Sequence, residues 1–120
     1  MSGKGELENV VLRDCLNYLH ANGVFCWRQN TGAFKVDNRF FRSSIAGVSD
    51  IIGVLPTGQF LAVECKREKG GRVSEKQKEF LQNVKEHNGV ALVVHSWQEL
   101  QEALKPILAR RIKKWQMNRI

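Results

Sequence analysis

Two acids and a lysine in the middle of the chain have a spacing that suits phosphodiester chemistry. Asp50 opens one apolar run, and Glu64 and Lys66 close the next, with the turn-type tetrad Pro-Thr-Gly-Gln between the runs. The pattern predicts a β-hairpin over 50–55 and 60–66, with Glu64 and Lys66 on one face. If the register brings Asp50 to Glu64, their carboxylates form a hard oxygen site suited to Mg²⁺ or Mn²⁺ rather than zinc.

Hydrolysis of a phosphodiester needs an activated water and compensation of negative charge in the transition state. We expect Asp50, Glu64 and the backbone carbonyl of Cys65 to hold a divalent ion that acts as Lewis acid and as source of hydroxide. Lys66 adds positive charge where a phosphate would sit. We expect it to act electrostatically, because an amine serves as a base only when its pKa is strongly lowered.

A longer set of residues resembles a known group of nucleases. Asp50 followed by Glu64-Cys65-Lys66 is similar to the PD-(D/E)XK nuclease signature. The segments Gly-Val-Ser-Asp at 47–50 and Gly-Gly-Arg-Val-Ser-Glu-Lys-Gln at 70–77 look like the VRR-NUC family of virus-type replication-repair nucleases. The resemblance covers roughly residues 6–104. One departure is that Ser49 stands where the family usually has proline.

The resemblance implies further site residues. The family has a glutamate from its first helix in the active site, and Glu8 is our choice by its facing, with Glu6 as the reserve. The family also places a glutamine near the site at the position of Gln77, although a helix capping box already explains that residue. Arg28 resembles the arginine that follows the family's first strand.

The elements that must position these residues follow from hydrophobic periodicity and capping signals. We expect an α/β fold with an αβββαβ core, in which helices flank a mixed sheet, as in the family that the chain resembles. The apolar strand 90–94 is expected at a central, doubly covered position. The expected elements are a helix over 6–22, a strand over 24–28, a hairpin over 33–44, the catalytic hairpin, helix 74–88, strand 90–94 and a helix from 96.

Cations interleaved with aromatic residues between 33 and 44 suggest contacts with DNA. The alternative is a hairpin whose aromatic residues pack inward and whose cations are solvated. A glycine-containing loop from Arg67 to Val73 should lie beside the site and touch the substrate backbone. The predicted DNA-binding residues are Arg28, Lys35, Arg39, Arg42, Arg67, Lys69 and Arg72.

The chain has 120 residues and a net charge of +7, which favours a polyanionic partner. We expect a nuclease domain over 1–104 and a basic C-terminal helix over 105–120, with Pro106 at the first position of that separate segment. The tail holds six cations and no acid, so nearly all the excess charge lies there. It could be a DNA-binding arm, a subunit contact or, less favoured, a membrane-surface helix.

No apolar run reaches the roughly 20 residues of a membrane span, so no membrane partner is expected. Three cysteines without CxxC spacing favour a reducing compartment and argue against structural zinc. We therefore expect a Mg²⁺- or Mn²⁺-dependent endonuclease in the cytoplasm of a bacterium or a phage-infected cell. Stand-alone VRR-NUC members resemble Holliday-junction resolvases, which implies a homodimer acting on branched DNA. Alternatives are a nuclease for flaps or nicked duplex, or a non-catalytic DNA-binding module.

Overall fold

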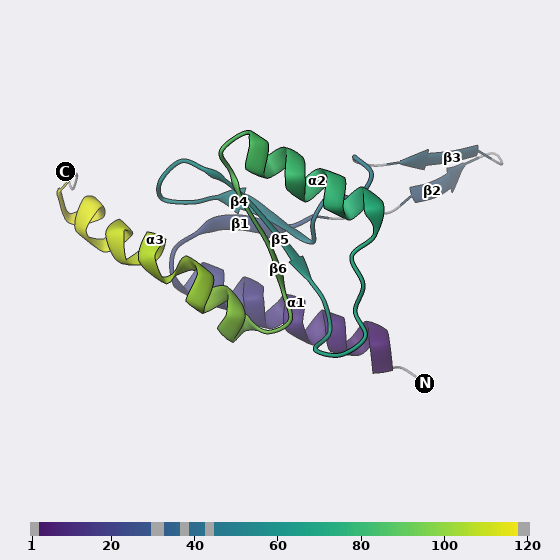
Figure 1. Cartoon of the computed structure of the whole chain (residues 1–120), viewed down its shortest axis with the longest axis horizontal. Helices are drawn as coiled ribbons and strands as arrows, with labels where there is room; N and C mark the ends of the chain where they lie inside the picture. The colour runs from purple at the N-terminus through teal and green to yellow at the C-terminus, as the bar shows by residue number, and fades with distance from the viewer. Residues whose placement is uncertain (1–2, 30–32, 37–38, 43–44, 118–120) are drawn as a thin grey trace.

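The computed structural model describes the backbone of residues 3–29, 33–36, 39–42 and 45–117, and the side chains of residues 7–29 and 45–109. Three helices and six strands follow one another along this part of the chain (Figure 1). They are α1 (Gly3–Ala21), β1 (Phe25–Arg28), β2 (Ala33–Val36), β3 (Arg39–Arg42), β4 (Ile51–Val54), β5 (Phe60–Cys65), α2 (Glu75–Glu86), β6 (Val90–Val94) and α3 (Trp97–Met117).

Four strands form a mixed sheet in the order β1-β4-β5-β6. The first three pair antiparallel, and β6 runs parallel to β5. Helices α1 and α3 cover one face, and α2 packs on the β5 and β6 side of the other, so the sheet lies between two helical layers (Figure 1). This arrangement confirms the predicted α/β fold with its αβββαβ core.

Alternation along the strands divides the core in two. Ile51, Leu61 and Val63 face α1 and α3 and are fully buried. Ile52 and Ala62 point the other way and pack on Leu81 and Val84 of α2. Because side chains on a strand alternate between faces, every second residue of the catalytic hairpin belongs to the same layer. The sheet therefore fixes which side each acid occupies.

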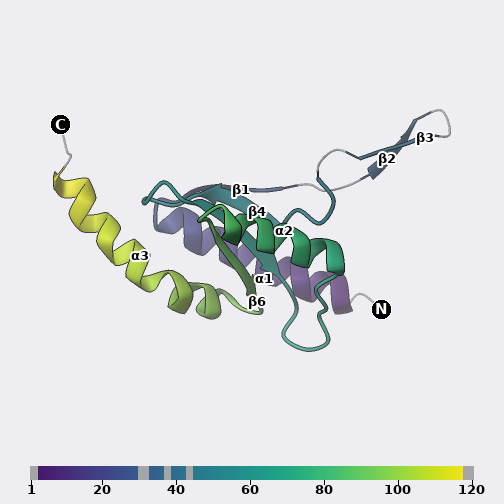
Figure 2. The ribbon, with the colours of Figure 1, turned by 45° about the horizontal axis from the view of Figure 1, so that its top comes forward.

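The predicted hairpin over 33–44 is present as a separate two-stranded sheet. Strands β2 and β3 pair antiparallel and extend away from the main sheet (Figure 2). The expected turn residues Asp37 and Asn38 lie outside the described residues.

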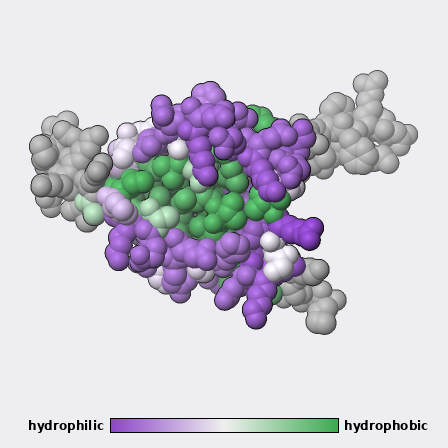
Figure 3. Space-filling model, viewed as in Figure 1, coloured by the Kyte–Doolittle hydropathy of each residue, from purple (hydrophilic) through white to green (hydrophobic). Residues whose placement is uncertain are grey.

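The expectation of a central position for β6 is wrong, because β6 is an edge strand among the described strands. Its apolar sequence has another cause: α2 packs on one face of β6 and α3 on the other. A continuous apolar sequence indicates that both faces of a strand are covered, but it does not indicate how many strands lie beside it. Figure 3 looks onto this edge and shows a hydrophobic surface over β6, between α2 and α3.

The expected helix start at Pro106 is also wrong. Helix α3 runs from Trp97 to Met117 with Pro106 inside it. Proline removes a helix hydrogen bond, but Leu104 and Leu108 on either side are buried in one core cluster, so packing holds the helix through it. Residues 105–117 are thus helical, whereas the division into domains at 104 stays a prediction.

Two apolar residues near the start of α1 are exposed. Leu7 is 55% and Val10 42% exposed, because the buried stripe of α1 begins at Leu12. With Arg67 and Lys69 they line an open groove of about 600 Å³. None of the helices in the described part of the chain combines the length and apolar character needed to cross a bilayer.

Candidate active site

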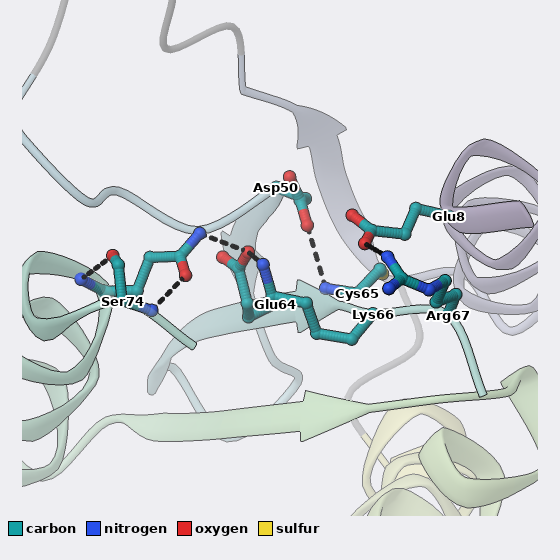
Figure 4. A network of polar contacts seen from close by, with 8 residues as sticks. Glu8, Asp50, Glu64, Cys65, Lys66, Arg67 and Ser74 are labelled. Carbon is teal, nitrogen blue, oxygen red and sulfur yellow. Dashed lines mark hydrogen bonds and ion pairs between the residues drawn. The ribbon is translucent and has the colours of Figure 1, made fainter. Parts of the chain in front are cut away.

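The β4–β5 register brings the two predicted acids together. Ile51 pairs with Val63, so one further step along the ladder sets Asp50 opposite Glu64, both on the side of α2. The backbone N–H of Cys65 donates to Oδ2 of Asp50 at 2.8 Å and holds that carboxylate at the end of β5 (Figure 4). The register thus meets the condition under which the sequence pattern brings the two acids together.

Glu64 is the most confined member of the site, with 2% of its surface exposed. Its Oε2 accepts a hydrogen bond from Nε2 of Gln77 at 2.7 Å and lies 3.3 Å from Nζ of Lys66. Its Oε1 is buried and has no hydrogen-bond partner among the described residues. Because a buried carboxylate oxygen without a partner is costly, this atom is an open position for a hydrogen-bond donor or a cation.

Gln77 connects helix capping to the site. Its Oε1 accepts from the Ser74 N–H at 2.8 Å, while the Ser74 Oγ accepts from the Gln77 N–H at 3.1 Å. These bonds complete the predicted capping box at the start of α2. Because the amide oxygen is engaged with Ser74, the NH₂ group is the part of the Gln77 amide that donates to Glu64. Gln77 therefore caps α2 and contacts Glu64 at the same time.

The electrostatics of the pair favour its uncharged forms when no cation is present. Burial, followed by the negative charge of Asp50, raises the pKa of Glu64 to about 7, and Lys66 opposes this effect. Burial also raises the pKa of Asp50, against the N–H of Cys65 and the charge of Lys66. Two adjacent acids with raised pKa values keep a proton at a pH where exposed carboxyls have lost theirs.

Glu8 approaches the site from α1 and forms an ion pair with Arg67. Its Oε2 lies 3.5 Å from a guanidinium nitrogen of Arg67, and its charge contributes to the raised pKa of Asp50. Figure 4 shows Glu8 reaching from α1 toward the Asp50 side of the site. Arg67 also donates to the carbonyl oxygen of Gly70 at 2.8 Å, so two protein contacts hold it. The side chain of Glu6 lies outside the described residues.

Cys65 contributes its backbone here, while its side chain belongs to the core. Contact with the Cys15 thiol, together with burial, raises the pKa of the Cys65 thiol well above its usual range. The thiol lies in the core cluster with Cys15, on the side of the sheet opposite to Asp50 and Glu64. The expected metal-binding role of the Cys65 carbonyl stays a prediction.

The predicted DNA-binding residues are distributed around the molecule. Lys69 and Arg72 are exposed on the loop that follows the site. Arg28 is exposed, but its pairing with Ile51 sets it on the side of α1, opposite to Asp50 and Glu64. The side chains of Lys35, Arg39 and Arg42 on β2 and β3 lie outside the part that the structure describes.

The role of Gly47 was missed by sequence reasoning. Its φ of +78° lies in the left-handed region, and a Cβ there would come within 2.2 Å of the Lys76 carbonyl oxygen and 2.7 Å of the Gln77 nitrogen. Only glycine lets this loop meet the α2 backbone so closely. Gly47 thus seats the start of α2, and with it Gln77, against the segment that leads to Asp50. The Gly-Val-Ser-Asp run carried the signal, but the contact partner is remote in sequence.

The arrangement has the donors that a hard divalent cation requires. No group of three His, Cys, Asp or Glu side chains within the described ranges lies close enough to hold a metal ion. Asp50 and Glu64 nevertheless present adjacent carboxylates, and Oε1 of Glu64 has no hydrogen-bond partner among those residues. Oxygen donors of this type suit Mg²⁺ or Mn²⁺.

Comparison with known proteins gives one result. No curated protein and no solved structure matches the chain. The model of the VRR-NUC domain matches residues 6–98, which include all the acids of the site together with Lys66 and Gln77. The chain therefore belongs to the VRR-NUC family, whose domain implies a nuclease-type function in the processing of DNA.

Proposed function

We propose that the protein is a divalent-metal-dependent endonuclease that hydrolyses DNA phosphodiester bonds. The observation that carries this proposal is the Asp50–Glu64 pair, whose burial and like charge raise the pKa of Glu64 to about 7. Such a pair is unfavourable when ionised unless a cation joins it. Strongly perturbed acids beside a lysine are typical of catalytic sites.

Asp50, Glu64 and the carbonyl of Cys65 are the residues that would hold Mg²⁺ or Mn²⁺. When bound, the ion supplies Lewis acidity and lowers the pKa of a coordinated water. Lys66, whose Nζ lies 3.3 Å from Glu64, provides fixed positive charge for the phosphate. Gln77 holds Oε2 of Glu64 through its amide, while Oε1, which has no hydrogen-bond partner among the described residues, would be available to a cation.

Glu8 would join the acids by leaving Arg67. The ion pair is a long one, at 3.5 Å, and the Glu8 side chain is 33% exposed. The phosphate of a bound strand competes with Glu8 for the guanidinium, because arginine binds phosphate oxygens in the same way as carboxylates. Arrival of DNA would then free Glu8 for the metal site and place Arg67 on the substrate backbone.

Branched DNA, such as a Holliday junction, is the substrate that we propose, with a homodimer as the acting form. Two symmetric nicks require two sites in fixed relation, which a two-fold dimer provides. The hydrophobic surface along the β6 edge in Figure 3 supports an association of two copies, because uncovered strand edges favour pairing. The basic segment 105–120 offers a DNA-binding arm, with a subunit contact as the alternative. We propose the cytoplasm of a bacterium or of a phage-infected cell as the location of the protein.

Cleavage of matched DNA substrates tests the proposal. The purified chain is incubated with Mg²⁺ or Mn²⁺ and with four-way junctions, flaps, nicked duplex and linear duplex. We expect the junction to be cut fastest, and equal cutting of all substrates would refute the junction preference. Asp50→Ala should abolish cleavage while DNA binding persists. A wild-type protein that binds DNA but cuts none of the substrates would instead favour the non-catalytic module.

A further inference from the structure

One face of the sheet is only half covered. Helix α2 packs on the side of β5 and β6, and Figure 2 shows β1 lying clear of it. Four large apolar side chains remain on the uncovered part: Phe25 is 70%, Trp27 42%, Val54 39% and Phe60 42% exposed. A contiguous apolar group of this kind on a sheet face marks a binding surface more often than scattered exposed residues do.

Register shows that these residues share the face of the catalytic acids. Phe25 pairs with Val54, and Val54 pairs with Phe60, which makes one transverse row. Trp27 pairs with Ile52 in the next row whose side chains point to the same face. The row after that begins at Gln29 and contains Asp50 and Glu64, by one further step along each ladder. Since two residues advance a strand by about 7 Å, Trp27 lies one such step along the sheet from the row of the acids, with Asp50 on the neighbouring strand and Glu64 one strand farther.

Trp27 is also held in a defined position. Its Nε1 donates to Oε1 of Gln29 at 3.0 Å, and its ring centroid lies 5.5 Å from that of Phe25, with a tilt of 56°. The indole edge is therefore anchored toward the catalytic row. The polar group of the ring already has a partner, so what the ring offers to a ligand is apolar and aromatic surface.

The chemistry of this surface selects its occupant. In paired DNA the faces of the bases are stacked on one another, so a protein meets phosphates, sugars and base edges rather than a base face on which a ring could stack. Unpaired bases, by contrast, stack on exposed aromatic side chains whatever their sequence. The excess positive charge lies mostly in residues 105–120, so that segment supplies the attraction for the strand and the aromatic surface supplies the stacking.

We propose that Trp27 and Phe25 form a stacking platform for unpaired nucleotides next to the scissile phosphate. The proposal rests on the nuclease function and adds a reason for a preference for branched DNA. A junction or flap can deliver an unpaired base to the platform, whereas an intact duplex must first open. The aromatic pair thus acts in binding the substrate and takes no part in the chemical step.

Cross-linking tests the platform in the unaltered protein. A single-stranded oligothymidine carrying one 5-iododeoxyuridine is irradiated in complex with the full chain, and the modified peptide is sequenced by mass spectrometry. We expect the cross-link at Trp27 or Phe25. A cross-link confined to other parts of the chain would overturn the proposal.

Affinity measurements with matched variants give a second test. Trp27→Leu keeps apolar bulk but removes the ring, and it should weaken oligothymidine binding roughly 5- to 150-fold in EDTA. Trp27→Phe should recover most of that loss, and binding of blunt duplex should be unchanged in both. Val10→Ala, which alters an equally exposed apolar residue on α1, should bind like the wild type.

The outcomes separate this proposal from the proposed function. Wild-type affinity of Trp27→Leu for oligothymidine would refute the platform, even if that variant cuts DNA with Mn²⁺. A change in sedimentation mass without loss of affinity would show that the surface is a contact between two copies, which also refutes it. Because the EDTA assay needs no cleavage, it tests the platform even if the wild type cuts nothing.

Discussion

Replacing Glu64 by glutamine removes a charge from the buried pair and leaves its shape almost unchanged. In the wild type, burial and the charge of Asp50 raise the pKa of Glu64 from 4.5 to about 7. One pKa unit corresponds to about 1.4 kcal/mol, so ionising Glu64 in the folded, metal-free chain costs roughly 3 kcal/mol of stability. The amide that Glu64→Gln introduces can accept from Gln77 and Lys66 as the carboxylate does, without the charge.

The sign of the effect follows from proton linkage. The folded chain keeps the Glu64 proton between pH 4.5 and about 7, whereas the unfolded chain has already released it. The stabilisation is therefore fully present below pH 4.5 and is lost as the pH rises through 7. Glu64→Gln escapes this loss, so it should be more stable than the wild type by roughly 3 kcal/mol at pH 8 and about equally stable at pH 4.5.

Urea unfolding followed by circular dichroism, in EDTA at both pH values, measures this difference. A gap between variant and wild type that does not grow from pH 4.5 to 8 would refute the buried-pair reasoning. Glu99→Gln is a control of opposite sign, because the N–H of His95 donates to Glu99 and lowers its pKa. That stabilisation is present above the ordinary pKa of Glu99 and is lost as the pH falls through the lowered one, so Glu99→Gln should be destabilised at pH 8.

Three further predictions follow from the same contacts. The affinity for Mg²⁺, measured by calorimetry, should fall about tenfold from pH 8 to pH 6, because the cation must displace the proton of Glu64. An affinity that does not depend on pH would contradict this prediction. Gln77→Ala should lower the cleavage rate about 10- to 100-fold, because Oε2 of Glu64 loses its hydrogen bond, whereas Gln82→Ala on the same helix should cut like the wild type. Equal cleavage rates for the two variants would show that Gln77 has no role in the site. Ser49→Ala should raise the free energy of unfolding by about 1 kcal/mol, because the buried Ser49 hydroxyl has no partner among the described residues, and a loss of stability in urea unfolding would show that the hydroxyl is satisfied.

Local patterns predicted the parts of the site that depend on neighbours in sequence. A tight turn fixes the register of a hairpin, so the meeting of Asp50 and Glu64 could be read from the chain. The capping box likewise placed Gln77 at the start of α2, because Ser74 lies only three residues away.

Features that depend on packing between distant segments could not be predicted in this way. Burial of Leu104 and Leu108 carries α3 through Pro106, although local rules end a helix there. The contact of Gly47 with α2 and the uncovered position of Trp27 depend on where α2 crosses the sheet. When helices cover both faces of a strand, its sequence is apolar whether it lies at the edge of the sheet, as β6 does, or in the centre.

The central claim is that the paired acids capture a divalent cation, and Mn²⁺ binding measured by electron paramagnetic resonance tests it most directly. The free-ion signal is titrated at pH 8 with the wild type, with the double variant Asp50→Asn, Glu64→Gln, and with Glu79→Gln as an exposed control on α2. We predict saturable loss of the signal for the wild type and for Glu79→Gln, and none for the double variant. Equal Mn²⁺ uptake by the double variant, or none by the wild type, would contradict the claim.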